Sequence, residues 1–282
     1  MRPADAGANR PFRWDLVTPD QLGTLLDGLE PPRPPFANEV IDAAAKVLAR
    51  SGGGELYFVG RSLDSMFDLL SGALAGTEHA PRLHRLPFSS RFEITDVEAQ
   101  AIRDILRASG IMPQSLARAH RPTALADLVS EGGTFGNLFR VLRDWVTVER
   151  EPWPVIRRKL RFVGVTRQER TSPNTWRWQQ AADWPAELPR SSVTNVSLHP
   201  SVWSYFGNRQ TKLTRSYHPR LWTADEPDGP QHDEKTREAL AEAVAYVELG
   251  RHADTRSRLA RTMASEPAYA ESWLRTLVRQ MA

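Results

Sequence analysis

The sequence predicts an α/β fold, a parallel sheet flanked by helices, for the middle of the chain. Between residues 55 and 165, short apolar runs alternate with segments of helical period, which is the pattern of consecutive β–α–β units. Two of the runs, 55–59 and 123–129, are almost continuously apolar, as expected for strands buried on both faces of a sheet. Each of these two runs ends in a short polar loop and continues into a helical pattern.

Residues 1–35 are predicted to form an N-terminal arm and a linker. Residues 1–11 have the character of a frayed tail, and Thr18-Pro19-Asp20 is a plausible helix start. The proline-rich run 31–35 is expected to be a stiff connector, because proline fixes φ and cannot continue a helix. A ligand for a proline-reading domain is the alternative use of this run.

Residues 36–170 are predicted to form the α/β core. The expected strands are 55–59, 83–88, 123–128 and 160–165, and helical patterns precede, separate and follow them. Right-handed crossovers place such strands parallel to one another with helices on both faces. We therefore expect the loops at 60–64 and 130–134 to lie on the same edge of the sheet.

Two regions follow the core. Residues 171–230 are rich in Trp, and aromatic side chains alternate with polar ones from 195 to 222. This stretch is expected to pack over the edge of the sheet that carries the two loops, as an irregular hood. Its aromatic residues fit the stacking of a planar ligand and, equally, the anchoring of an irregular subdomain. Residues 231–282 show a strong helical period and are expected to form a helical subdomain remote from the site.

Composition excludes several classes of site. The chain has 282 residues, 40% of them hydrophobic and 25% charged, with a formal charge of +3 and no cysteine. Disulfides, thiolate metal sites and a cysteine nucleophile are therefore excluded, and we expect no protein-built metal site. The absence of an apolar run of about 18 residues and of a signal-peptide pattern predicts a cytoplasmic protein without a membrane segment. Only four of the 37 basic residues are lysines, and arginine suits phosphate recognition, although coding bias explains the same composition.

The stretch from 123 to 135 is the strongest candidate for a binding site. A buried strand ends there at Asp127, a loop containing Gly132 and Gly133 follows, and a helical period begins at Phe135. The free N–H groups and the dipole of a helix N-terminus favour a phosphate at such a place. A second unit of the same design carries Arg61 after the strand 55–59.

The order of residues in this stretch resembles the phosphoribosyl-pyrophosphate loop of the type I phosphoribosyltransferases. In that family two acids are followed by two aliphatic residues, two small or hydroxylated residues, Gly, any residue, and Thr or Ser. The positions that fit in register are Asp127, Leu128, Val129, Ser130, Gly132, Gly133 and Thr134. Ala126 stands in place of the first acid, and Glu131 in place of the second small residue. The resemblance spans about residues 50–170, and its motif is moderately specific.

The resemblance implies a transferase of nucleotide metabolism that uses phosphoribosyl pyrophosphate and Mg²⁺ to ribosylate a nucleobase or another small acceptor. Asp127 would hold the ribose hydroxyls, and Glu131 would be the general base. The residues implied in binding are Arg61 and Ser62 on the diphosphate, Ser130, Gly132, Gly133 and Thr134 on the 5′-phosphate, and Arg91 in the family's lid. Restoring the missing acid with Ala126→Asp is then expected to tighten donor binding.

Three alternatives remain open at this point. Arg61 can serve to pair with a carboxylate at the sheet edge. The same fold can be catalytically silent and bind a nucleotide or RNA, which Ala126 and the arginine-rich second half favour. The loop match can also be accidental, in an unrelated α/β enzyme. A homodimer is compatible with each of these alternatives.

Overall fold

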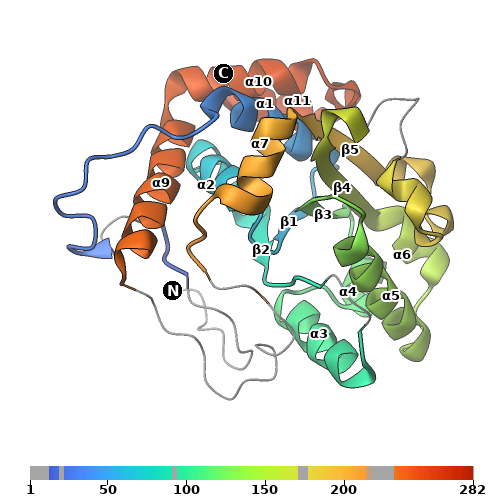
Figure 1. Cartoon of the computed structure of the whole chain (residues 1–282). Coiled ribbons are helices and arrows are strands. Elements are labelled where there is room, and N and C mark those ends of the chain that lie inside the picture. Colours follow the sequence, from blue (N-terminus) through green and yellow to red (C-terminus); the bar gives the residue numbers. More distant parts are fainter. Residues whose placement is uncertain are drawn as a thin grey trace.

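A five-stranded parallel sheet lies at the centre of the protein (Figure 1). The computed structural model describes residues 13–18, 22–90, 94–170, 177–214, 217 and 232–281. The strand order is β2-β1-β3-β4-β5, and all four neighbouring pairs are parallel. The strands are β1 (Glu55–Val59), β2 (Leu83–Leu86), β3 (Thr123–Leu128), β4 (Leu160–Arg167) and β5 (Val193–Leu198).

The four expected strands are confirmed as neighbours, and the α/β class with them. The sheet continues beyond residue 170, however, because β5 comes from the region expected to be an irregular hood. Its segment reads Val-Thr-Asn-Val-Ser-Leu, a polar and apolar alternation typical of an edge strand with one solvated face. Only three of its six residues are apolar, so the segment was not predicted as a strand.

Helices cover both faces of the sheet (Figure 1). One layer, with α1, α2 and α9–α11, packs on Leu56, Phe58, Ala126 and Val163. The other layer, α3–α6, packs on the opposite face. The helices are α1 (Ala37–Arg50), α2 (Asp64–Ala73), α3 (Asp96–Ala108), α4 (Pro113–Arg118), α5 (Gly133–Val148), α6 (Trp153–Lys159), α7 (Pro200–Ser204), α9 (Glu234–Arg251), α10 (Ala253–Ala264) and α11 (Ser272–Met281).

The C-terminal helices belong to the first layer and share its core. Helix α9 lies against α2 at backbone contact: a Cβ on Gly72 would stand 2.0 Å from the Val247 carbonyl oxygen, and one on Gly250 would stand 2.1 Å from the Leu69 oxygen. Any larger residue at these two glycines would push the helices apart. The region 232–281 is therefore helical as expected, but it packs on the sheet's own helices and reaches the candidate site.

Residues 199–214, which we call the edge segment, run along the carboxyl ends of the strands. The segment begins after β5 and continues through α7 and one π-helical turn, Tyr205–Arg209. The Arg167 guanidinium at the end of β4 lies 5.9 Å from the ring centre of Trp203, and a Cβ on Gly207 would lie 3.3 Å from the Leu128 side chain at the end of β3. The expected cover of this edge is thus confirmed for these residues, whereas most of 215–222 lies outside the described residues.

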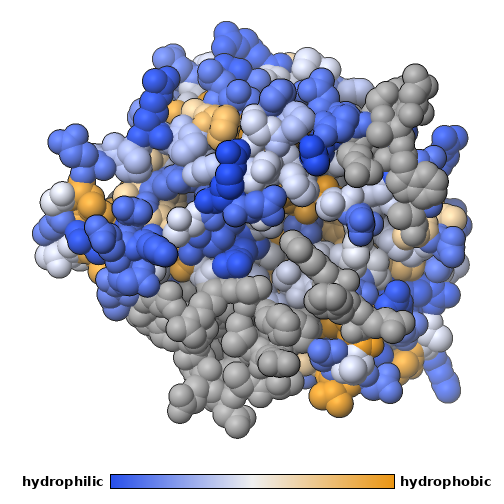
Figure 2. Space-filling model, viewed as in Figure 1, coloured by the Kyte–Doolittle hydropathy of each residue, from blue (hydrophilic) through white to orange (hydrophobic). Residues whose placement is uncertain are grey.

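The N-terminal arm also packs into the protein. Trp14 and Leu16 are buried in a small apolar cluster with Leu213 of the edge segment and Leu240 of α9. The residues described between 22 and 29 form a 3₁₀-type turn rather than the longer helix that we expected near Thr18. None of the described helices is both long and apolar enough to cross a membrane. On the face shown in Figure 2, hydrophilic side chains predominate and hydrophobic ones form small separate groups.

Candidate functional site

The two predicted loops begin side by side at the carboxyl edge of the sheet. They follow β1 and β3, which pair directly, and neighbouring strands lie about 4.8 Å apart. In an open parallel sheet, ligands bind where the strand order reverses, and in the order 2-1-3-4-5 that point lies between β1 and β3. The expectation of a shared edge is therefore confirmed.

The β3–α5 loop offers backbone groups rather than side-chain charge. Ser130, Glu131 and Gly133 are exposed, and helix α5 begins at Gly133 without a side-chain cap. Gly132 has φ 83°, a left-handed conformation that glycine adopts without strain. The Thr134 hydroxyl donates to the Ser90 carbonyl oxygen at 3.3 Å, so it ties the helix to the segment that follows β2.

Trp178 forms a buried floor beneath this loop. Its ring is only 2% exposed, and Cβ atoms on Gly132 and Gly164 would stand 2.5 Å and 3.1 Å from it. Its indole N–H donates to Asn195 Oδ1 of β5 at 2.7 Å. The missing side chain of Gly132 therefore makes room for an indole ring below the loop, while the neighbouring Gly133 faces solvent. This pairing could not be predicted from the sequence, because Trp178 lies 46 positions from Gly132 along the chain.

Asp127 lies at the end of β3 and is only 8% exposed. Its Oδ1 accepts from the Leu128 backbone N–H at 2.7 Å. Successive side chains of a strand point to opposite faces, so Ala126 faces the layer of α1, α2 and α9–α11, where it is fully buried. An acid at position 126 would therefore enter the apolar core, and we no longer expect Ala126→Asp to tighten donor binding.

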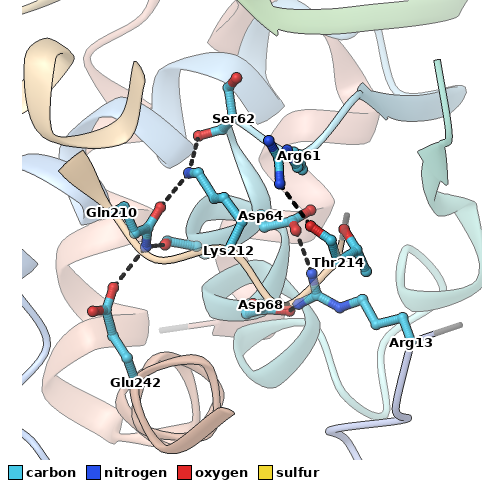
Figure 3. Close-up of polar contacts among 10 residues, drawn as sticks. Arg13, Arg61, Ser62, Asp64, Asp68, Gln210, Lys212, Thr214 and Glu242 are labelled. Carbon is cyan, nitrogen blue, oxygen red and sulfur yellow. Dashed lines mark hydrogen bonds and ion pairs between the residues drawn. The ribbon is translucent and has the colours of Figure 1, made fainter. Parts of the chain in front are cut away.

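The β1–α2 loop is bound to the edge segment. Arg61 Nη1 donates to the Thr214 carbonyl oxygen at 2.7 Å. Lys212 Nζ donates to Gln210 Oε1 at 2.5 Å and reaches the Ser62 carbonyl oxygen at 3.5 Å. Figure 3 shows these contacts converging above the start of α2. Arg61 and Ser62 thus lie at the expected edge, and Lys212 joins them from a distant part of the sequence.

Two carboxylates at the start of α2 are paired with Arg13 of the N-terminal arm (Figure 3). Arg13 Nη2 donates to both oxygens of Asp68, at 2.5 and 2.6 Å, and Nη1 donates to Asp64 Oδ2 at 2.5 Å. The side chains of Arg13, Asp64 and Asp68 are 3%, 9% and 4% exposed. Burial raises the pKa of Asp68 to about 6, although Arg13 opposes this shift.

Helix α9 closes the same network. Gln210 Nε2 donates to Ser65 Oγ and to Glu242 Oε1, both at 2.6 Å, and the Tyr205 hydroxyl donates to the other oxygen of Glu242 at 2.7 Å. Glu242 therefore receives its partners from the edge segment. This contradicts our expectation that residues 231–282 would stay remote from the site.

Three cations near this loop have no ion-pair partner within the part of the chain that the structure describes: Arg61, Arg85 and Lys212. Arg85, on β2, lies with its guanidinium 5.1 Å from the ring centre of Phe67. Burial lowers the pKa of each of the three, for Lys212 to about 8, and Arg61 adds repulsion to Lys212. A bound anion would offset the cost of burying these charges and the repulsion between Arg61 and Lys212.

The structure brings most of the predicted residues to one edge and adds others. Arg61, Ser62, Asp127 and the loop from 130 to 134 lie there, whereas Arg91 falls outside the described residues. Sequence reasoning missed Arg13, Arg85, Lys212 and Trp178. Lys212 had a signal, as one of only four lysines and a member of the polar-aromatic stretch, whereas Arg85 lies within an expected strand and had no such signal.

The described residues contain no group of three or more His, Cys, Asp or Glu side chains placed to hold a metal ion. Mg²⁺ commonly binds through one or two carboxylates together with the phosphates of a substrate. Asp127 at the end of β3 fits the carboxylate part of such a shared site.

In comparisons with known proteins, no family model, no curated protein and no solved structure matched this chain.

Proposed function

We propose that the protein binds phosphoribosyl pyrophosphate with Mg²⁺ at the carboxyl edge between β1 and β3 and transfers its phosphoribosyl group to a small acceptor. The observation that carries the proposal is the pairing of two unlike loops at this point. Near the β1–α2 loop lie Arg61, Arg85 and Lys212, which have no ion-pair partners among the described residues. The β3–α5 loop has exposed residues and leads into helix α5, whose first turn has no side-chain cap. A donor with phosphate groups at both ends of a ribose needs two such places.

The two loops divide the donor between them. The cationic side takes the diphosphate, because Arg61 and Lys212 offset its charge and Arg61 donates in a planar fork. The N–H groups at the start of α5 and the exposed Ser130 and Gly133 take the 5′-phosphate. Asp127, between them on β3, accepts from the ribose hydroxyls. Mg²⁺ bound with the donor neutralises part of the phosphate charge.

In the proposed reaction the bond between ribose C1 and the diphosphate oxygen breaks, and a bond from C1 to the acceptor nucleophile forms. The electron pair of the broken bond leaves with diphosphate, whose growing charge the cationic side stabilises. Glu131, exposed beside the start of α5, accepts the proton that the acceptor loses. The edge segment contributes by positioning the donor, because it runs across the carboxyl ends of the strands where the donor would bind.

A second candidate function is binding of the same donor, or of a nucleotide, without transfer. The observation that favours it is that this chain has only one, Asp127, of the two adjacent acids in the phosphoribosyltransferase motif. Position 126 faces the apolar core, and Asp127 accepts a bond from the backbone of its own neighbour Leu128. A site with one acid in place of two can bind the donor without catalysing the transfer.

Release of diphosphate distinguishes the two functions. Purified full-length protein is incubated with phosphoribosyl pyrophosphate, Mg²⁺ and a panel of nucleobases, and diphosphate is followed enzymatically. Acceptor-dependent release that falls at least tenfold in Asp127→Asn supports the transferase. Saturable donor binding without release for any acceptor supports the silent binder. A gel shift with single-stranded RNA in the absence of donor binding would point to RNA recognition and would contradict both.

A further inference from the structure

The ion pair formed by Arg13 joins the N-terminal arm to the loop that we propose for the diphosphate. Asp64 and Asp68 lie in the first two turns of α2, directly after Arg61 and Ser62. Arg13 contacts three of their four carboxylate oxygens. The fourth, Asp64 Oδ1, is buried and has no hydrogen-bond partner among the residues that the structure describes.

The two carboxylates lie close enough to the unpaired cations to compete for them. Burial lowers the pKa of Arg61, Arg85 and Lys212, and the negative charge of Asp64 opposes that shift in all three. In Figure 3, Asp64 lies between Lys212 and Arg13. Asp64, once released from Arg13, would therefore have Arg61 and Lys212 as its new partners, whereas the charge of Asp68 acts on Arg85.

We infer that Arg13 is a positioning residue for anion binding: it holds Asp64 and Asp68 in an ion pair and thereby keeps Arg61 and Lys212 available for a phosphate-bearing ligand. A buried carboxylate that loses its partner is strongly destabilised, and Asp64, whose charge already acts on Arg61 and Lys212, is the one placed to pair with them. Without Arg13 the loop would satisfy its cations internally, and an incoming anion would have to displace a carboxylate. The inference rests on the proposed anion site, but not on the transfer reaction.

The packing of the arm couples this ion pair to the edge segment. Trp14 and Leu16, next to Arg13, share an apolar cluster with Leu213, which lies between Lys212 and Thr214. Arg61 donates to the Thr214 carbonyl oxygen. When the arm is docked, Arg13 therefore pairs the carboxylates and the same arm supports the chain that carries Lys212.

The test is calorimetric titration of full-length protein with inorganic diphosphate. The variants are Arg13→Met, the triple variant Arg13→Met/Asp64→Asn/Asp68→Asn, and Arg158→Met as a control. Arg158 is exposed on α6, which ends where β4 begins, so the control removes one positive charge at the opposite edge of the sheet. Thermal unfolding of each variant checks that it is folded.

We expect Arg13→Met to weaken diphosphate binding at least fivefold, the triple variant to return to within threefold of the parent, and Arg158→Met to stay within twofold. Recovery on removing the two carboxylates is the decisive result, because a merely structural loss would deepen with two further substitutions. A loss below fivefold in Arg13→Met, or a triple variant as weak as the single one, overturns the inference.

If Arg13→Met does not fold, the double variant Asp64→Asn/Asp68→Asn decides. It should bind diphosphate more tightly than the parent, and weaker binding overturns the inference. Parent protein that shows no diphosphate binding up to millimolar concentration removes the anion site and this inference together. Diphosphate binding that follows the expected pattern, without any phosphoribosyl transfer, leaves the inference standing and removes only the transferase.

Discussion

The two loops at the carboxyl edge of the sheet share a design and differ in what supports them. Each follows a buried parallel strand and opens a helix. The β3–α5 loop rests on an apolar floor, Trp178, and presents backbone groups above it. The β1–α2 loop rests on the ion pairs of Arg13 with Asp64 and Asp68 and on a second polar group around Gln210 and Glu242 of α9. The first loop depends on the packing beneath it and the second on charge balance. Substitutions beneath the first loop should therefore lower stability, and changes of charge at the second should alter diphosphate affinity.

The largest effect is expected from Ala126→Asp, which places a carboxylate in the apolar face of β3. Full burial raises the pKa of a carboxyl group by about 3 units or more, and each unit costs about 1.4 kcal/mol, so we expect the free energy of unfolding to fall by about 4 kcal/mol at pH 7. Ala126→Asn is the matched neutral variant. Denaturant unfolding should show their difference shrinking as the pH falls, because the folded protein then holds the neutral acid.

Trp178→Ala should remove the floor of the β3–α5 loop and cost about 3–5 kcal/mol, the usual range for a buried aromatic residue. Trp178→Phe keeps most of the ring but loses the bond to Asn195, at about 1 kcal/mol. Inorganic diphosphate, which we place on the other loop, should bind the folded Phe variant within twofold of the parent. A large loss there would mean that the two loops do not divide the site as described.

A smaller loss is expected from Gly132→Ala, which adds left-handed strain and a clash with Trp178. Gly76→Ala is a matched control, since Gly76 has φ 79° and no neighbour within 4 Å of a built Cβ. Strain alone costs about 1–2 kcal/mol, and overpacking adds about 1–3 kcal/mol. Denaturant unfolding should therefore show Gly132→Ala as the more destabilised of the two, and equal losses would mean that Trp178 does not press on the loop.

The mildest effect concerns charge at the β1–α2 loop. Burial lowers the pKa of Lys212 to about 8, so its positive charge is present at pH 7 and is lost as the pH rises through that value. Diphosphate affinity should then fall by about three- to tenfold between pH 7 and pH 9, beyond the fall shown by Lys212→Arg, which stays charged. Equal pH profiles for the parent and Lys212→Arg would exclude Lys212 from the anion site.

Much of the fold could be predicted from the sequence, because local patterns determine it. Apolar runs identified β1, β3 and β4, and glycine-containing loops marked the ends of β1 and β3. The edge strand β5 was missed because one of its faces is solvated. The packing of α9 on α2 was also missed, since it depends on two glycines, Gly72 and Gly250, that are far apart in the chain.

The candidate site could be predicted only where a motif is continuous in sequence. Asp127, Gly133 and Arg61 follow directly after strands, and the topology brings them together. Arg13 and Lys212 lie about 50 and 150 positions from Asp64 along the chain, and only tertiary packing places them at the same loop. Their role is a matter of charge balance among partners, which no single stretch of the sequence contains.

Calorimetric titration of the unmodified protein with phosphoribosyl pyrophosphate in the presence of Mg²⁺ tests directly whether the edge between β1 and β3 binds this donor. We expect saturable binding that weakens by about tenfold in Asp127→Asn, because one charged hydrogen bond is worth about 1.5–3 kcal/mol and 1.4 kcal/mol is one decade. Gly133→Val should abolish it, since a side chain there stands where the 5′-phosphate would approach. If the unmodified protein gives no heat of binding up to millimolar donor, the proposed donor site between β1 and β3 is wrong.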